Sequence, residues 1–396
     1  IVKKLLILTK NFKFKKVTRV EINSALLNFT KFIPKVESNF IESSSPPEVF
    51  VGRIGYPKVY AGPVLPLEKG DTSIYAQSEK WFGKSLEEIA KLRLSLIRTK
   101  KKLNVLKKEK FLEDLQEIIL SKSSVDTEAK LKNKPKGYLL SEDSQPFGPS
   151  AIIEELKANP GSSEKRLEKF YYANDVKANE AIFELWKNKL EFSKMQQALS
   201  LGMLGIERKV VPTRWSITAI DSNLSLKLIE EIKKFETINE YRVYSLKYLD
   251  NVWVIVLLPE LWSYESLEEW YPGTIFNEEI AIGSDYEPFE GIKHYASIGG
   301  CYYSARLAIA EKLYGERKQA AAIVFREIHN GYLMPVGVWN VREAVRNALK
   351  TKPMLFSSFE ESLNFASSIL SIPLKVWVKY SKILKEKSFQ KRLINF

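Results

Sequence analysis

The sequence predicts an α+β fold whose core is a mainly antiparallel sheet flanked by helices, with a long basic helical region and a flexible C-terminal tail. Strand-like runs concentrate in the middle of the chain, between residues 210 and 259, and helical periodicity dominates on either side. This segregation favours an antiparallel sheet over alternating strand–helix units. The chain has 396 residues, 45% hydrophobic and 12% aromatic, enough for two or three domains with sizeable cores.

The first half of the chain is expected to begin with a basic, weakly patterned extension, residues 1–44. Residues 45–66 carry short β-rich pieces broken by Gly and Pro, which indicates a hairpin or loop. Apolar residues then recur at three- and four-residue steps from Leu86 to Ile118, with basic residues on the other face, which predicts helix. Residues 121–137 have few apolar positions and predict a flexible loop, and residues 164–204 predict a second helical region.

The second half of the chain carries most of the expected sheet. VVPTRWSITAID, residues 210–221, predicts a strand that ends at an N-cap before a helix. Residues 241–259 contain two β-rich runs around Asp250-Asn251, which predicts an antiparallel hairpin. The last third predicts a helix, a hairpin turning at Asn330-Gly331 and a further helix, at residues 301–313, 320–339 and 341–350.

Cysteine and histidine are rare in this chain, which excludes several kinds of site. Cys301 is the only cysteine, so no disulfide framework is expected, and the two histidines, His294 and His329, leave too few soft ligands for a structural zinc site. This composition favours a reducing cytoplasm. No apolar run approaches the roughly 18–20 residues that cross a bilayer, so we expect no membrane partner.

Positive charge is concentrated in two segments of the chain, whose net charge is +13. Residues 91–136 hold 14 Lys or Arg against 6 Asp or Glu, and residues 372–396 hold 7 against 1. Clustered positive charge is the electrostatic footprint of a protein that binds nucleic acid. We therefore expect DNA phosphates at the first segment, including Lys100, Lys101 and Lys102. The alternative is a solvated helix surface of a Lys-rich protein.

The C-terminal heptapeptide QKRLINF has the spacing of a short binding motif. Gln390, Leu393 and Phe396 lie three residues apart, and this pattern resembles the PCNA-interacting peptide that attaches DNA-processing proteins to a sliding clamp. One helical turn would place Leu393 and Phe396 on one apolar side, while Gln390 would hydrogen-bond in a side pocket. The usual motif has two adjacent aromatic residues, and here the chain stops after the first. The alternative is a frayed basic terminus with one apolar side chain.

Four longer stretches resemble the archaeal Nre family of DNA repair proteins. They are SPPEVFVGRIGYPKVYAGP, VVPTRWSITAID, HYASIGGCYYSARLAIAEKL and MPVGVWNVREAVRNAL, at residues 45–63, 210–221, 294–313 and 334–349. The resemblance extends from about residue 40 to the C-terminus. It implies a basic extension, an Nre N-terminal region, an Nre C-terminal region and a clamp-binding tail, at residues 1–44, 45–285, 286–388 and 389–396.

The resemblance implies a role in the repair of damaged DNA, coupled to the clamp, because family members commonly finish in a clamp-binding peptide. Many relatives carry an N-terminal, cysteine-rich segment that resembles a zinc finger. This chain has no cysteine before Cys301, so we expect no zinc finger in it. The resemblance implies no particular chemical activity, and residue roles must come from the chain itself.

Two candidate sites precede residue 222. In GRIGYPK the glycines let backbone approach a phosphate, and Arg53 or Lys58 would contact its oxygens; alternatively the glycines serve tight turns and Arg53 pairs with a surface acid. Arg214 adjoins Trp215, a pair suited to contacting a phosphate and stacking on a base. Asp221 is a candidate ligand for a divalent metal in phosphodiester chemistry, or an N-cap.

Two further candidates lie in the last third. His294 precedes Gly299-Gly300 and the helix that carries Arg306, so a helix start, an arginine and a general acid or base are expected near one another. An isolated histidine is also often structural. Arg342 and Arg346 share a helix face at four-residue spacing and form a candidate phosphate clamp.

Two classes of function follow from these residues. In the first, the protein is an enzyme on DNA ends or lesions, a nuclease or end-processing enzyme in which Arg214, Asp221, His294 and Arg306 surround a phosphodiester with Mg²⁺ or Mn²⁺. In the second, it is a non-catalytic DNA-binding adaptor that links the PCNA clamp to other repair proteins.

Overall fold

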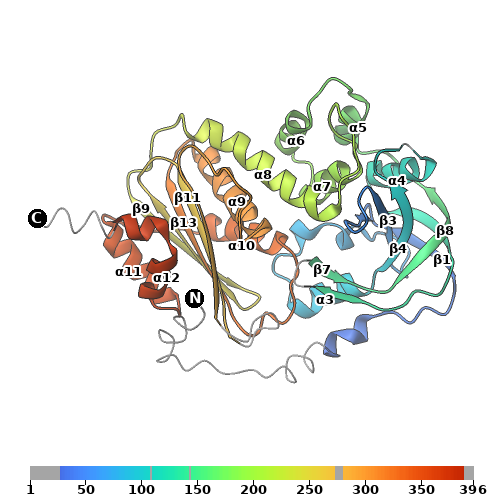
Figure 1. The fold of residues 1–396 in the computed structure, drawn as a ribbon, viewed down its shortest axis with the longest axis horizontal. Helices are drawn as coiled ribbons and strands as arrows, with labels where there is room; N and C mark the ends of the chain where they lie inside the picture. Colours follow the sequence, from blue (N-terminus) through green and yellow to red (C-terminus); the bar gives the residue numbers. More distant parts are fainter. Residues whose placement is uncertain (1–26, 108, 142–143, 273–279, 388–396) are drawn as a thin grey trace, which may run out of the picture.

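The computed structural model describes residues 27–107, 109–141, 144–272 and 280–387. Two six-stranded sheets lie side by side along the long axis of the molecule, one built from residues 40–159 and the other from residues 241–356 (Figure 1). Helices pack around and between the sheets, which confirms the predicted α+β class. The N-terminal extension up to residue 26 and the tail residues Gln390, Leu393 and Phe396 lie outside the described residues.

The first sheet has the strand order β1-β5-β8-β4-β3-β2. Its strands pair antiparallel except β4 and β8, which pair parallel. The predicted hairpin at residues 45–66 is confirmed, since Val49–Val51 pairs with residues 61–63. The strands are β1 (Phe40–Ser45), β2 (Val49–Val51), β3 (Lys58–Leu65), β4 (Ile97–Asn104), β5 (Val125–Leu131) and β8 (Ser150–Asn159).

Two expectations for this half were wrong in detail. The region from Leu86 to Ile118 is not one long helix: α3 (Leu86–Leu94) and α4 (Lys110–Leu120) are separated by β4, and Lys100, Lys101 and Lys102 lie on that strand. The expected loop at residues 121–137 contains β5, whose side chains alternate between buried and exposed. Thr127 and Ala129 occupy two of its buried positions, and these residue types give a weak hydrophobic signal in sequence.

Four helices connect the two sheets: α5 (Lys165–Tyr172), α6 (Ala178–Lys187), α7 (Phe192–Ser200) and α8 (Thr213–Ile232). The prediction of a helical region at residues 164–204 is confirmed as three short helices. The predicted strand at residues 210–221 was wrong, because α8 begins at Thr213 and runs without a break. Its β-branched and aromatic residues suggested a strand, but burial of Ile220, Leu224 and Leu228 at helical spacing stabilises a helix.

The second sheet has the order β12-β11-β13-β10-β9-β14, and only β11 and β13 pair parallel. The predicted hairpin at residues 241–259 is confirmed, although its turn is Leu249-Asp250, one residue earlier than expected. The predicted hairpin at residues 320–339 was wrong: within the described residues only β13 is a strand there. The strands are β9 (Tyr241–Tyr248), β10 (Asn251–Leu258), β11 (Ser263–Trp270), β12 (Ala281–Glu287), β13 (Ala321–Ile328) and β14 (Met354–Phe356).

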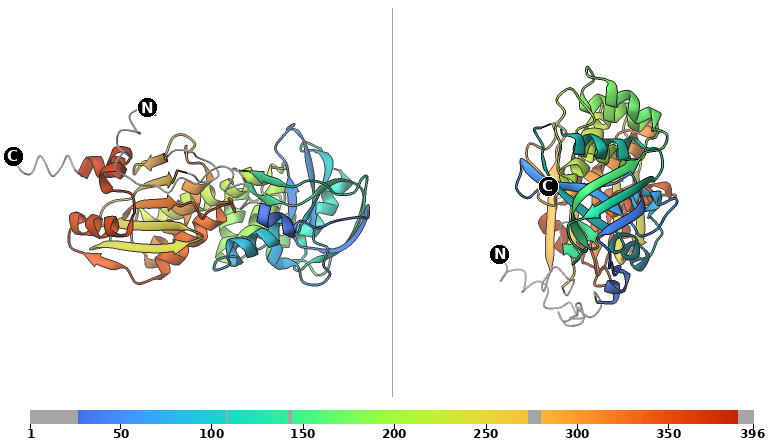
Figure 2. Two further views of the ribbon diagram at one scale, coloured as in Figure 1. Left: turned by 90° about the horizontal axis from the view of Figure 1, so that it is seen from below. Right: turned by 90° about the vertical axis from the view of Figure 1, so that its right-hand side faces the viewer.

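Helices cover both faces of the second sheet (Figures 1 and 2). One face carries α8, α9 (Gly300–Glu316) and α10 (Trp339–Lys350); the other carries α11 (Phe359–Ile369) and α12 (Leu374–Tyr380). Because strand side chains alternate, Trp253 and Ile255 of β10 join the core under α8–α10, while Val254 and Val256 join the core under α11 and α12. Both helices predicted in the last third, α9 and α10, are confirmed.

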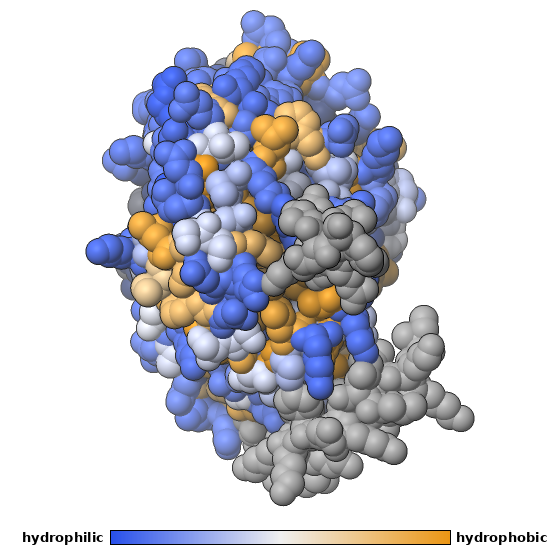
Figure 3. All heavy atoms as spheres, turned by 90° about the vertical axis from the view of Figure 1, so that its left-hand side faces the viewer, coloured by the Kyte–Doolittle hydropathy of each residue, from blue (hydrophilic) through white to orange (hydrophobic). Residues whose placement is uncertain are grey.

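The end of the molecule that carries α11 and α12 shows patches of hydrophobic residues between hydrophilic ones (Figure 3). The expected region boundary at residues 285 and 286 falls inside β12, and the second sheet takes strands from both sides of it. Within the described part of the chain, no helix is both long enough and apolar enough to cross a bilayer.

Candidate functional site

A cleft of about 620 Å³, here called the central cleft, opens between the two halves of the molecule. Phe50 of β2, Phe147 of β7 (Ser144–Phe147) and Arg93 of α3 line it from the first half. Trp270 of β11 and Arg326 of β13 line it from the second half. The cleft therefore depends on residues that are far apart in sequence.

Three helices begin at the central cleft. The first residues of α8, α9 and α10 line it, and none of the three helices has a side-chain hydrogen bond at its N-cap. A Cβ placed on Gly300 would lie 2.9 Å from Val338 Cγ1 and 3.5 Å from Thr218 Oγ1, so the starts of α9, α10 and α8 meet closely. Helix N-termini carry partial positive charge and point N–H groups outward, which favours an anion here.

Gly299 forms the N-cap of α9 with φ of 64°, a backbone conformation that favours glycine. A Cβ built on Gly299 would meet no atom within 4 Å, so the backbone borders open space at this point. A bound group can therefore approach the start of α9 without contacting a side chain at this position.

Two arginines of the cleft are held by carboxylates. Arg93 donates from both terminal nitrogens to Glu48, at 2.9 and 3.1 Å, and Arg326 Nη1 donates to Glu268 Oε1 at 2.8 Å. Each pair is largely buried. These ion pairs form part of the cleft wall. Because each pair is neutral overall, they leave little net charge there.

Arg342 differs because only part of its guanidinium is used. Nη1 donates to both oxygens of Asp221, at 2.9 and 3.0 Å. Nε lies 3.4 Å from Glu343 Oε1, but neither Nε nor Nη2 makes a hydrogen bond. The side chain is completely buried and lines the cleft. A buried donor without a partner costs about 1–3 kcal/mol, so Nη2 is a strong candidate to bind a ligand.

Aromatic rings form much of the remaining wall. Phe50 and Phe147 pack edge to face at 5.1 Å, and Trp81 and Trp339 at 5.4 Å. At the mouth, Tyr295 is 65% exposed and lines the cleft. Cationic helix starts beside aromatic rings are the combination that binds nucleotides, because rings stack on bases while the cations hold phosphates.

The structure brings three of the predicted motifs together. Arg214 lies in the first turn of α8, not on a strand, and lines the cleft beside Gly299 and Gly300. The GRIGYPK turn, with exposed Arg53 and Lys58, lies next to it: Tyr56 and Trp215 contact at 5.7 Å between ring centres.

Asp221 does not occupy the predicted position. It lies inside α8, fully buried, so it is neither a strand end nor an N-cap. Arg342 contacts both carboxylate oxygens, and the Ser304 hydroxyl donates to one of them at 2.6 Å. The residues do not fit a metal centre at Asp221, and the described residues contain no group of three or more His, Cys, Asp or Glu side chains that would hold one.

Arg306 and His294 do not come together around a phosphate. Arg306 is buried on α9, where it pairs with Glu287 and donates to Ser225 Oγ at 3.1 Å. His294 lies exposed on the loop before α9 and is not among the residues that line the cleft. The predicted catalytic grouping of Asp221, His294, Arg214 and Arg306 is therefore not assembled in this structure.

Arg346 does not form the expected clamp with Arg342. Its guanidinium is held by Glu311 at 2.7 and 2.8 Å and by Glu343 at 2.6 Å. The two arginines do share a helix face, since both lie over the ring of Phe192. Lys101 and Lys102, on β4, are exposed, and Lys100 is half-buried; none of the three lines the cleft.

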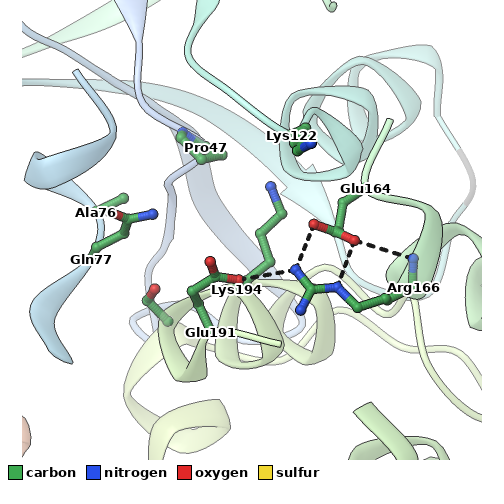
Figure 4. A pocket seen from close by; sticks show the side chains of 9 residues that line it. Pro47, Ala76, Gln77, Lys122, Glu164, Arg166, Glu191 and Lys194 are labelled. Carbon is green, nitrogen blue, oxygen red and sulfur yellow. Dashed lines mark hydrogen bonds and ion pairs between the residues drawn. The ribbon is translucent and has the colours of Figure 1, made fainter. Parts of the chain in front are cut away.

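A smaller pocket of about 120 Å³ lies beside the cleft and contains Lys194 of α7. Arg166 is held between Glu164 and Glu191, and Lys194 extends past this cluster (Figure 4) to donate to the carbonyl of Ser121. Burial lowers the pKa of Lys194 to about 8. At neutral pH this pocket therefore holds a buried cation that the carboxylates do not contact directly.

Sequence reasoning missed Gln196, Arg326, Phe147 and Tyr295 as cleft residues. Gln196 lines the cleft, is 7% exposed, and its Nε2 makes no hydrogen bond. A lone Gln in a helix carries no signal in a single sequence. Tyr295 was within reach of sequence reasoning, because an aromatic residue four positions before the Gly-Gly helix start at Gly299 is a reasonable ligand contact.

Comparisons with known proteins find relatives over most of the chain. Two family models match: "Archaeal Nre, N-terminal" over residues 16–277 and "Archaeal Nre, C-terminal" over residues 287–396. No solved structure matches the chain significantly.

Named relatives cover nearly the same span. The chain is 42% identical to the DNA repair protein NreB of Archaeoglobus fulgidus, over 87% of this chain and 89% of the relative. It is 37% identical to the DNA repair protein NreA of the same organism, over 84% and 86%, and 29% identical to the DNA repair protein NreA of Haloferax volcanii, over 87% and 86%. The resemblance seen in the sequence is thereby confirmed, and the chain belongs to the archaeal Nre family.

Proposed function

We propose that this chain is a DNA repair protein that contacts DNA through the central cleft and is recruited by the PCNA sliding clamp through its C-terminal peptide. The names of its relatives support the repair role. The observation that carries DNA binding at the cleft is the meeting of three uncapped helix starts with Arg342, whose Nη2 lacks a partner. DNA supplies the phosphates that such a site favours.

DNA affinity tests the role of the cleft. Arg214 is exposed at the start of α8, so Arg214→Gln should leave the fold intact, weaken binding and reduce the slope of log K against log salt by about 1. Arg317→Gln is the matched control, because Arg317 is exposed at the opposite end of α9. Fluorescence anisotropy with labelled DNA measures both. Equal losses in the two variants would show a general charge effect and contradict a specific role for the cleft.

Recruitment by the clamp rests on the sequence of the tail. Leu393 and Phe396 are the proposed anchors in a groove of the clamp, and Gln390 the polar contact. Such a short peptide binds weakly alone, because ordering it offsets a small buried area, and it raises the local concentration of the protein at the clamp. Deletion of residues 389–396 should abolish clamp binding in calorimetry. Unchanged co-elution of a Leu393→Ala, Phe396→Ala double variant with the clamp would overturn this part.

The geometry favours a non-catalytic, DNA-binding adaptor over a nuclease. Of the acidic groups at the cleft and directly behind it, Glu48, Glu268 and Asp221 are each held by an arginine. Held in this way, these carboxylates are poorly placed to bind Mg²⁺ or Mn²⁺. Incubation with nicked, flapped and damaged DNA, with and without either metal, tests this choice. Metal-dependent product made by the parent protein would establish the enzyme instead.

A further inference from the structure

The central cleft is too small for duplex DNA but has the size of a nucleotide site. Small-molecule sites typically enclose about 300–1,000 Å³, and the cleft, at about 620 Å³, lies within this range. Only one nucleotide of a double helix could therefore enter the cleft at a time. Proteins that reach a single base do so by taking the nucleotide out of the stack.

One side of the cleft suits a phosphate. The starts of α8, α9 and α10 meet there, and Arg342 presents Nη2 without a hydrogen-bond partner although the side chain is completely buried. Both hydrogen bonds from Arg342 to Asp221 come from Nη1, and Glu343 lies 3.4 Å from Nε, so the hydrogen-bonding capacity of Nη2 is unused. An oxyanion would complete the guanidinium and also face the helix starts.

The other side suits a base. Phe50 and Phe147 from the first half and Trp270 from the second line the cleft with aromatic rings, and Trp81 and Trp339, which contact each other edge to face, also line it. Gln196 adds an amide that is 7% exposed and whose Nε2 has no hydrogen-bond partner. Carboxamides read the hydrogen-bonding edges of bases, and stacking is worth about 1–3 kcal/mol per base.

We propose that the central cleft is the site of one nucleoside phosphate unit, with its phosphate at the starts of α8–α10 and Arg342, and its base among the aromatic rings beside Gln196. This inference rests on the proposed function in one respect: under that function the nucleotide belongs to DNA and leaves the base stack of the duplex to enter the cleft. A free nucleotide presents the same chemistry, so the experiment must distinguish these two sources.

Cys301 provides a native reporter of occupancy. It is the only cysteine of the chain and lines the cleft next to Gly300. Burial raises the pKa of its thiol, so alkylation is slow and its rate can be followed by mass spectrometry. The full-length protein is alkylated alone, with dAMP, with a fully paired duplex, and with the same duplex carrying one unpaired adenosine.

The expected result is that the duplex with the unpaired adenosine slows alkylation at least fivefold more than the paired duplex. Protection by dAMP alone would assign the same site to a free nucleotide. If neither dAMP nor the unpaired adenosine protects Cys301, the inference is overturned. Should DNA still bind in anisotropy in that case, the proposed DNA-binding function stands without it.

Variants separate the two halves of the site. Arg342→Lys retains a cation that can pair with Asp221 but removes Nη2, the guanidinium nitrogen proposed to bind the phosphate. Gln196→Leu removes the amide. Each should remove most of this protection, so that the two duplexes slow alkylation nearly equally, while Arg317→Gln should leave the fivefold difference unchanged. Circular dichroism confirms that the fold is retained. Protection equal to that of the parent in both variants would contradict the assigned contacts.

Discussion

Two buried charged clusters of this protein differ in how completely their polar atoms are used. Under the C-terminal helices, Glu327 accepts the backbone N–H groups of Ser371 and Ile372 at 3.0 and 2.7 Å. At the cleft, only Nη1 of Arg342 makes hydrogen bonds, and Nε and Nη2 make none. The first cluster holds one segment of chain against another, whereas the second has donor capacity left for a ligand.

Glu265 completes the closed cluster. Its carboxylate accepts from the backbone N–H groups of Lys382 and Ile383, at 2.6 and 3.1 Å, and from the Ser381 hydroxyl at 2.5 Å. The helical residues 382–387, directly before the proposed clamp-binding tail, are thereby fixed to the second sheet. Burial of a charge does not by itself indicate function; an unused hydrogen-bonding atom on a residue that lines a cleft is a candidate contact for a ligand.

The largest effect is expected from removing the ion pair between Arg342 and Asp221 at the cleft. Arg342→Ala leaves Asp221 buried without its cation, and removing one partner of a buried pair costs about 3–5 kcal/mol. Urea denaturation measures the loss of unfolding free energy. The double variant Arg342→Ala, Asp221→Ala should recover a large part of it; a double variant as unstable as the single one would contradict the ion-pair explanation.

A third buried carboxyl, Glu269 of β11, shows the cost of having no partner. Neither oxygen makes a hydrogen bond, and burial, together with the neighbouring Glu327, raises its pKa to about 9. Between pH 4.5 and 9 the folded state therefore keeps a proton that the unfolded state has lost, so this group lowers the unfolding free energy as pH rises.

Glu269→Gln should therefore be more stable than the parent by about 3 kcal/mol at pH 7, with the gap shrinking toward pH 4.5 and growing toward pH 9. Chemical denaturation at several pH values provides the measurement. A stability difference between variant and parent that does not change between pH 4.5 and 9 would show that Glu269 is ionised in the folded state over this range. Glu269 would then resemble Glu327, whose charge the fold stabilises.

A smaller loss is expected in the closed cluster. Glu265→Gln keeps an acceptor but replaces one carboxylate oxygen by a donor that faces a backbone N–H, which should cost about 1–2 kcal/mol of unfolding free energy. Hydrogen exchange should become faster at Lys382 and Ile383 while the protection of β10 is unchanged. If exchange at these two amides stays as slow as in the parent, Glu265 does not hold this helix.

The smallest effect is expected at the mouth of the cleft. Tyr295 is 65% exposed, so Tyr295→Ala should leave the melting temperature unchanged and weaken DNA binding by about 1 kcal/mol through lost stacking. Tyr172→Ala is a suitable control, because Tyr172 is 69% exposed and does not line the cleft. Equal binding by the Tyr295 variant and the parent would exclude a stacking role at the mouth.

The fold was predictable where a local pattern was strong. The β9–β10 hairpin and helices α9 and α10 follow from alternation and helical periodicity, and these elements are confirmed. Predictions failed where tertiary burial outweighed propensity: α8 contains Trp215, Ile217 and Thr218 near its start, residues that favour strands in isolation. The candidate site was found in part, since Arg214, Arg342 and Gly299-Gly300 all line the cleft.

The sequence by itself determined the fold class, the family and the residues able to contact a phosphate. It did not determine which arginines keep an N–H group without a hydrogen-bond partner. Arg306, Arg342 and Arg346 look alike along the chain, but each pairs with a carboxylate distant in sequence, namely Glu287, Asp221 and Glu311, which lie 19, 121 and 35 residues away. Only the tertiary structure brings these partners together. Because a guanidinium is available only where no carboxylate completes its hydrogen bonds, the tertiary structure decided that the nitrogen without a partner belongs to Arg342.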